Sequence, residues 1–145
     1  MNFKKYNKSI VIIGSSKIAK IHYNFFYENN FSKFYFVGRK KNKIDTFIKE
    51  NNIKNANFLN KRYLKSSKSL ISLCNNTNFH QDYLEYINSN KQILIVEKPL
   101  ISPKIFKKNY LEKIKNYYKK FRKLVVVYPM IFLARSYNKF INIKN

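Results

Sequence analysis

SIVIIGSSKIA, residues 9–19, joins a short apolar run to a glycine and then to the start of a helical pattern. An apolar run that ends in glycine is typical of a buried parallel strand. Residues 17–28 follow with Ile18, Ile21 and Phe25 at helical spacing. The sequence therefore predicts a strand, a tight turn and a helix at this point.

The turn itself keeps the G-x-G-x-x-G/A spacing of dinucleotide-binding domains, with Gly14 first, Ser16 at the second glycine position and Ala19 third. Gly14 would permit the tight turn, and the helix N-terminus would offer free N–H groups to a pyrophosphate. Ser16 brings a side chain to a place where backbone normally approaches phosphate, which predicts weaker binding, although its hydroxyl could donate. A tight turn without any ligand explains Gly14 equally well.

The same alternation of apolar runs and helical patterns continues along the chain. Strands are predicted at residues 34–37, 57–59, 69–73, 92–96 and 124–128, and helices at 42–50, 79–88 and from 102 to about 122. In the second helix Ile44, Phe47 and Ile48 face inward. In the third, Phe79, Tyr83, Leu84 and Ile87 share one face.

Strand–helix alternation at this spacing requires right-handed crossovers and a parallel sheet. We therefore predict an α/β fold, a doubly wound parallel sheet of the Rossmann type with about six strands and helices on both faces. This domain would occupy residues 1–129. A short helical tail, residues 130–145, would be the start of a second domain.

The composition limits the classes of partner. The net charge is +23, but only Arg39, Arg62, Arg122 and Arg135 are arginines, the residue on which specific nucleic-acid recognition depends most. Lysines spread along the whole chain, together with many Asn, Ile, Phe and Tyr residues, fit the bias of an AT-rich genome. We expect a solvated basic surface with salt-sensitive, nonspecific binding to polyanions and no specific nucleic-acid partner.

The lone Cys74 allows no internal disulfide, which suits a reducing cytoplasm. No apolar run approaches the roughly 20 residues of a membrane span, and the N-terminal apolar stretch is shorter than a signal-peptide core. The expected location is cytoplasmic, without a membrane partner.

The end of the second strand bears on the choice of cofactor. NAD-binding domains place an Asp or Glu there to hold the ribose hydroxyls, whereas this chain has Arg39, Lys40 and Lys41. A guanidinium in place of the carboxylate favours the 2′-phosphate of NADP, with NAD as the alternative. The competing interpretation is that these three cations are simply part of a lysine-rich surface.

Two further segments carry a resemblance to a known family. Residues 75–80 (NNTNFH) follow the fourth strand, and residues 96–100 (VEKPL) follow the fifth. With the opening segment 14–22 and residues 126–128, they resemble the Gfo/Idh/MocA oxidoreductases, the glucose–fructose oxidoreductase and inositol dehydrogenase family. Its members carry a T-P-N-x-x-H-like turn, a helix and then an E-K-P motif. The resemblance runs from Ile10 to about Ile141, but Asn75 and Asn76 stand where Thr and Pro are usual.

The resemblance implies an NAD(P)-dependent oxidoreductase acting on a sugar or polyol, with no metal site. Lys98 would be the catalytic residue, contacting substrate and cofactor and helping with proton handling, and the Lys98–Pro99 bond can be cis in the family. His80 is either structural or cofactor-lining, while His22 is expected to be a packing residue and Cys74 a core residue. The predicted cofactor-binding residues are Gly14, Ser15, Ser16, Lys17, Ile18, Arg39, Lys40, Asn75, Asn76, His80, Glu97, Lys98 and Pro99.

In the family a second domain follows the sixth strand and supplies substrate contacts and the general acid/base. The resemblance therefore implies a truncated or split enzyme that binds a dinucleotide weakly and turns over no sugar or polyol alone. Its partner would be a separate substrate-domain chain or a second copy in a homo-oligomer. Two alternatives remain: a non-catalytic, nucleotide-binding regulatory module, and a basic nucleic-acid-associated protein that uses the scaffold as a frame.

Overall fold

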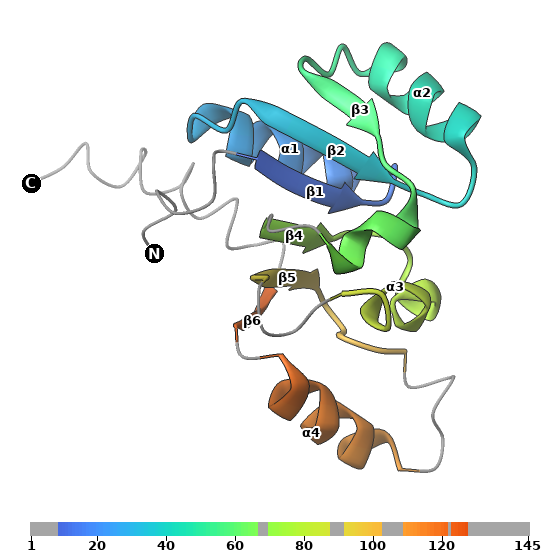
Figure 1. Cartoon of the computed structure of the whole chain (residues 1–145), viewed down its shortest axis with the longest axis vertical. Coiled ribbons are helices and arrows are strands. Elements are labelled where there is room, and N and C mark those ends of the chain that lie inside the picture. Colours follow the sequence, from blue (N-terminus) through green and yellow to red (C-terminus); the bar gives the residue numbers. More distant parts are fainter. Residues whose placement is uncertain (1–8, 67–69, 88–91, 103–108, 122, 128–145) are drawn as a thin grey trace, which may run out of the picture.

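The computed structural model describes residues 9–66, 70–87, 92–102, 109–121 and 123–127. Six strands form one parallel sheet in the order β3-β2-β1-β4-β5-β6 (Figure 1). The strands are β1 (Ser9–Ile13), β2 (Lys33–Val37), β3 (Ala56–Phe58), β4 (Leu70–Leu73), β5 (Leu94–Glu97) and β6 (Leu124–Val127). This confirms the predicted doubly wound α/β fold, with its strand order reversing between β1 and β4.

The central strands β1, β2 and β4 end at the same level, so the turns that follow them lie next to one another. Ile13 of β1 pairs with Val37 of β2 on one side and with Leu73 of β4 on the other. The residues that follow continue the ladder for one more step, since the Gly14 amide donates to the Val37 carbonyl at 2.9 Å. The turns after β1, β2 and β4 therefore open at the same edge, on both sides of the point where the strand order reverses.

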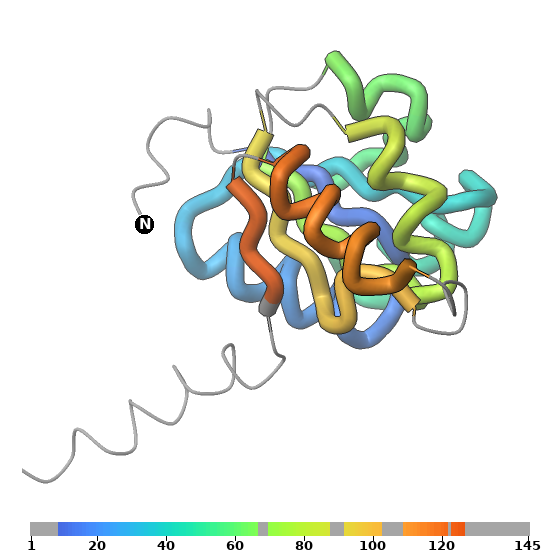
Figure 2. The backbone as a smooth tube through the Cα atoms, turned by 90° about the horizontal axis from the view of Figure 1, so that it is seen from below, coloured from blue at the N-terminus to red at the C-terminus, as the bar shows by residue number. Residues whose placement is uncertain are grey.

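Helices cover both faces of the sheet (Figures 1 and 2). The α1 (Lys17–Glu28) and α2 (Lys41–Glu50) helices pack on one face, where Phe26 and Ile44 meet Phe34 and Phe36 of β2. The 3₁₀ helix η2 (Lys61–Lys65), α3 (Gln81–Leu84) and α4 (Tyr110–Lys120) pack on the other. Alternate residues of β1 enter the two cores, which is why a continuous apolar run was needed there.

The predicted helix at 17–28 is confirmed, but the three residues that signalled it are not the ones it buries most deeply. Ile21 is 38% exposed, and Ile18 and Phe25 are only partly buried. The helix instead buries Ala19, His22, Tyr23 and Phe26. This orientation of the helix covers two large aromatic rings and lets His22 reach Ser72 of β4, a contact that apolar spacing could not signal.

The predicted helix at 79–88 was also wrong in length. A 3₁₀ turn, η3 (Thr77–Phe79), comes first, and α3 then spans only four residues. The Asn76 side chain accepts from the Asn78 amide and starts the separate turn. Phe79 is consequently 37% exposed and is not part of the core, whereas Tyr83, Leu84 and Ile87 are buried as predicted.

The strands and α2 agree with the sequence to within about two residues, and α2 turns Ile44, Phe47 and Ile48 to the core as expected. The 3₁₀ helix η2 was not predicted. The predicted helix from 102 to about 122 was wrong at its start, because Asn109 has a left-handed backbone (φ +63°) that interrupts a helix, and α4 begins only at Tyr110. The predicted helix start at Pro103, the last residue of the predicted sixth strand, Tyr128, and the predicted tail at 130–145 lie outside the described residues.

Candidate functional site

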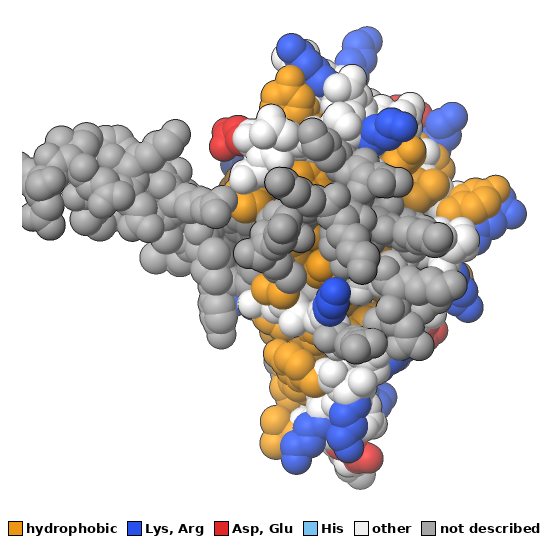
Figure 3. Space-filling view, turned by 60° about the vertical axis from the view of Figure 1, so that its left-hand side comes forward, with side chains coloured by type: hydrophobic (Ala, Val, Ile, Leu, Met, Phe, Trp, Pro, Cys, Tyr) orange, Lys and Arg blue, Asp and Glu red, His pale blue; other side chains and the backbone are white. Residues whose placement is uncertain are grey.

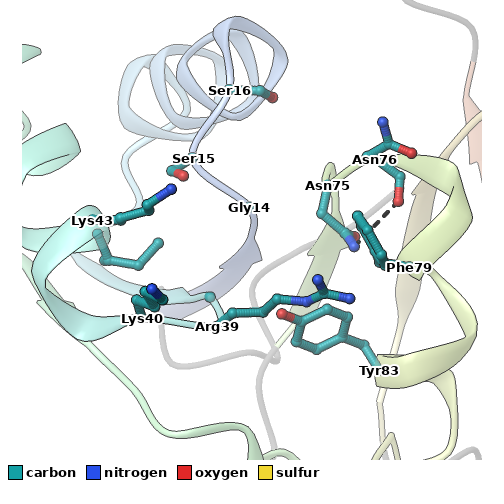
Figure 4. Close-up of a pocket in the computed structure, with 12 residues that line it drawn as sticks. Gly14, Ser15, Ser16, Arg39, Lys40, Lys43, Asn75, Asn76, Phe79 and Tyr83 are labelled. Carbon is teal, nitrogen blue, oxygen red and sulfur yellow. Dashed lines mark hydrogen bonds between the residues drawn. The ribbon is translucent and has the colours of Figure 1, made fainter.

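A hollow of about 410 Å³ lies at the edge where β1, β2 and β4 end (Figure 4). Seven of the residues predicted to bind a dinucleotide line it, namely Gly14, Ser15, Ser16, Arg39, Lys40, Asn75 and Asn76. The sequence-based prediction missed five further lining residues: Gly38, Lys43, Ile44, Phe79 and Tyr83. Lys17, Ile18, His80, Glu97, Lys98 and Pro99 are not among the lining residues.

Gly14 occupies a position that other residues would enter only with strain. Its φ is +126°, a conformation that side chains rarely adopt, and a Cβ built there would lie 2.9 Å from the Asn75 backbone nitrogen. The turn after β1 therefore runs directly against the turn after β4. The result is a bare backbone at the floor of the hollow.

Ser16 caps α1 instead of pointing freely at the hollow. Its Oγ accepts from the Ala19 amide at 3.3 Å and donates to the Cys74 carbonyl at 3.3 Å. Serine is a favoured N-cap because its oxygen satisfies an otherwise orphan amide of the first helical turn. The Ser16 hydroxyl thus donates to the residue that follows β4, and a phosphate would meet the remaining amides of the α1 N-terminus.

Three cations come from the β2–α2 segment. Arg39 reaches across the hollow, and Lys43 extends toward Ser15 (Figure 4). Lys40 lies between them at the N-cap of α2. None of the twelve residues that line the hollow is acidic. The rim beside the phosphate turn is therefore strongly electropositive, and Lys43 could have been included from the sequence by its place one turn beyond Lys40.

Arg39 contacts two residues of the β4–α3 segment. Its Nη2 donates to Asp82 Oδ2 at 3.1 Å, and its guanidinium carbon lies 3.6 Å from the centre of the Phe79 ring. Both charged side chains are at least half exposed. No sequence signal indicated this pair, because the partners are 43 positions apart and meet only when β2 and β4 flank β1.

Asn75 offers an unused acceptor. Its Oδ1 is buried and has no hydrogen-bond partner among the described residues, while its Nδ2 donates to the Asn76 carbonyl at 3.4 Å. A buried acceptor without a partner is costly. Asn75 also lines the hollow, so a rotation of its side chain would bring this oxygen within reach of a ligand hydroxyl there.

His80 is fully buried and bonds to two loops. Nδ1 lies 3.0 Å from the Leu100 carbonyl oxygen and Nε2 lies 2.9 Å from that of Asn75. Burial lowers its pKa, and the hydrogen bonds to these carbonyls oppose that effect. These are the contacts of a structural residue, which holds the Asn75 turn against the segment after β5.

The E-K-P segment lies over a buried polar chain. The Lys98–Pro99 bond is cis and Lys98 is exposed. Glu97 Oε2 lies 3.9 Å from His22 Nε2, and His22 Nδ1 lies 2.6 Å from Ser72 Oγ. Burial lowers the pKa of His22 to about 4, and burial raises the pKa of Glu97 against the opposing charge of Lys98. His22 is therefore neutral at pH 7, and its polar contacts were missed by the sequence-based prediction.

Cys74 continues this chain, with its Sγ 3.1 Å from Ser72 Oγ. Burial raises the pKa of the thiol to about 12. A thiolate is the reactive form of cysteine, so Cys74 is a core residue, as expected. Among the described residues no three His, Cys, Asp or Glu side chains gather as they would around a metal ion. No helix in the described part of the chain is long and apolar enough to span a bilayer.

The basic side chains do not gather into one stripe on the face that Figure 3 presents. Lysines and arginines lie at several separate places there, with apolar and neutral side chains between them. A dispersed arrangement of this kind is what a solvated basic surface would show.

Several solved dehydrogenases and reductases share this fold. They include the myo-inositol dehydrogenase from Lactobacillus casei in complex with NAD(H) and myo-inositol, with a TM-score of 0.58 and 14% identity over 82% of this chain and 35% of that one. Biliverdin reductase from Synechocystis, in complex with biliverdin and NADP⁺, has a TM-score of 0.61 and 15% identity over 83% of this chain and 37% of that one. A Gfo/Idh/MocA family oxidoreductase from Vibrio cholerae has a TM-score of 0.60 and 14% identity over 82% of this chain and 38% of that one. The chain thus spans 35–38% of the length of these three.

No curated protein matches the sequence significantly. The Gfo/Idh/MocA family model, described as "Oxidoreductase family, NAD-binding Rossmann fold", matches residues 8–129. That range contains the phosphate turn, the hollow and the E-K-P segment. The chain therefore belongs to the Gfo/Idh/MocA oxidoreductase family and contains its NAD-binding Rossmann domain.

Proposed function

We propose that this chain is the dinucleotide-binding part of an oxidoreductase that acts on a sugar or polyol and prefers NADP(H) to NAD(H). One observation carries the preference: Arg39, Lys40 and Lys43 line the hollow, and no carboxylate does. In NAD-binding Rossmann domains a carboxylate after the second strand holds the ribose hydroxyls. The solved neighbours include one complex with NAD(H) and one with NADP⁺, so the fold alone does not decide between the two.

The lining residues fit a dinucleotide. The pyrophosphate would lie against the backbone at Gly14 and the N-terminus of α1, where amides point outward. After a rotation of its side chain, Asn75 would accept from a ribose hydroxyl through the Oδ1 that has no partner among the described residues. Arg39, with Lys40 and Lys43 beside it, would hold a 2′-phosphate by charge-assisted hydrogen bonds.

The reaction would take place beyond this hollow, at the end of β5. A bound nicotinamide supplies the hydride acceptor or donor, and Lys98 would be the cation beside it. Lys98 is exposed at the same sheet edge as the Asn75 turn, because β5 pairs in parallel with β4. Buried His22 and His80 have lowered pKa values and are not placed to accept a proton from a substrate. A sugar or polyol substrate rests on the family membership and on the inositol dehydrogenases among the neighbours.

The substrate contacts and the general acid/base are proposed to lie outside the nucleotide domain. Residues 1–129 would then be the nucleotide domain and 130–145 the start of the next segment. A cytoplasmic location is proposed because Cys74, the only cysteine, is a free buried thiol.

The test is a fluorescence titration with NADPH and NADH at one fixed salt concentration. The chain should bind NADPH more tightly. Arg39→Asp should weaken NADPH about tenfold or more, since hydrogen bonds to charged groups contribute about 1.5–3 kcal/mol each, and should leave NADH nearly unchanged. Lys41→Asp is the matched control, because it makes the same charge change two positions away on a residue that does not line the hollow. Equal or tighter NADH binding by the parent chain would refute the proposed preference.

A further inference from the structure

We infer that Asp82 tunes the choice between the two dinucleotides by competing with the 2′-phosphate for Arg39. The inference rests on the proposed function, because it concerns how strongly Arg39 discriminates in that same hollow. Asp82 was not among the residues that the sequence pointed to. It enters through its 3.1 Å contact with the Arg39 guanidinium.

Arg39 stands between two hollows. It lines the dinucleotide hollow and also a second one of about 220 Å³, which Asp82 lines together with Phe58, Asn60 and Lys61. Asp82 does not line the first. The carboxylate therefore holds the guanidinium from the side away from the phosphate turn, and a nucleotide would approach from the opposite side.

The guanidinium of Arg39 stacks on the ring of Phe79 and can shift along its face. The Arg39 guanidinium carbon lies 3.6 Å from the ring centre (Figure 4), a distance at which the cation and the ring attract each other. A change of partner from Asp82 to a phosphate can thus keep this stacking. The phosphate need only displace one carboxylate.

The pair is one that a phosphate can break. Arg39 and Asp82 are 60% and 50% exposed, and an exposed ion pair is worth little in water. A phosphate monoester carries a charge of about −1.5 to −2 at pH 7, more than the carboxylate. The phosphate should therefore displace Asp82 from the guanidinium, and the loss of the ion pair lowers its affinity. The same carboxylate repels the phosphate. Both effects weaken the binding of NADP(H). They leave the binding of NAD(H) unchanged, because NAD(H) has no 2′-phosphate.

The test uses adenosine 2′,5′-bisphosphate and 5′-ADP as probes, titrated calorimetrically into the full 145-residue chain at low, fixed salt. Asp82→Asn should increase the affinity for the 2′,5′-bisphosphate about two- to fivefold, which corresponds to the free energy of an exposed ion pair. The affinity for 5′-ADP should change less than twofold. Glu85→Gln is the matched control. It removes the same charge from an exposed residue three positions on that lines neither hollow, and both affinities should stay unchanged.

Asp82→Ser should repeat the selective gain, and circular dichroism would verify that each variant is folded. A tightening of both probes alike in Asp82→Asn, or no change in either, would overturn the role of Asp82 while leaving the proposed function standing. Failure of the parent chain to bind either probe would instead overturn the proposed function. A gain in Glu85→Gln equal to that in Asp82→Asn would show a general charge effect and would also overturn the inference.

Discussion

Gly14→Ala is the substitution by which the geometry of the phosphate turn can be tested most directly. The added Cβ would lie 2.9 Å from the Asn75 backbone nitrogen, 3.1 Å from its Cα and 3.1 Å from the Cys74 carbonyl carbon. All three are backbone atoms at the end of a central strand, so no side chain can rotate out of the way. The φ of +126° is a second obstacle, because alanine at that angle is strained.

Both costs can be put on an energy scale. A residue held in a sparsely populated backbone region costs about 1–3 kcal/mol, and forcing extra volume into a packed site costs about 1–3 kcal/mol. Gly14→Ala should therefore lower the free energy of unfolding by about 2–6 kcal/mol, a large part of the roughly 5–15 kcal/mol typical of a domain. The variant should also lose dinucleotide binding, because relief of the clash must separate the turns after β1 and β4.

Gly38 is the matched control, since it is the only other glycine and the same change there meets a different neighbour. Its Cβ would lie 2.7 Å from Ile44 Cδ1 and 2.9 Å from Ile44 Cγ1, two atoms of one side chain and not of the backbone. Gly38→Ala should change stability by no more than about 1 kcal/mol, because the reduced freedom of the unfolded chain offsets part of the repacking cost. Urea unfolding followed by circular dichroism measures both. With a slope of about 2 kcal/mol per molar, Gly14→Ala should lower the midpoint by roughly 1–3 M. Equal midpoints for the two variants would show that the two turns do not touch as described.

Two further predictions concern pH and activity. The pKa of His22 is lowered to about 4 in the folded chain, so between that value and its ordinary 6.5 the unfolded chain binds more protons, and stability should fall as pH decreases through this window by roughly 1 kcal/mol per pH unit. Urea unfolding of the parent chain and His22→Gln at pH 4 to 7 isolates this contribution from that of Glu97, which titrates in the opposite sense, and parallel curves for the two proteins would contradict it. The 145 residues by themselves should bind a dinucleotide and reduce no NADP⁺ with a panel of sugars and polyols. The two histidines, His22 and His80, are fully buried and not placed to accept a proton from a substrate, and the lack of a positioned proton acceptor costs about 10²–10⁴-fold. Robust turnover by pure protein of verified mass would show that the catalytic residues lie within this chain.

The sequence alone was sufficient for the fold class and for the edge of the sheet at which the candidate site is proposed. A short, continuous apolar run that ends at Gly14 is typical of a strand buried on both faces, and the helical pattern after it predicts the crossover. Such signals are local, because a strand, a turn and a helix N-terminus are each encoded by residues next to one another. For the same reason Arg39 and Asn75, each just beyond an apolar run, could be assigned to one edge of the sheet before their contacts were known.

Only the tertiary structure decided which side chains meet across that edge. Asp82 and Phe79 belong to a segment whose periodicity predicted one helix, yet the Asn76 cap breaks it into two turns and leaves Phe79 under the Arg39 guanidinium. The face that α1 buries was likewise settled by a polar contact, His22 with Ser72, between residues 50 positions apart. Such pairs leave no trace in local spacing, because their energy depends on distances that exist only once β1, β2 and β4 lie side by side.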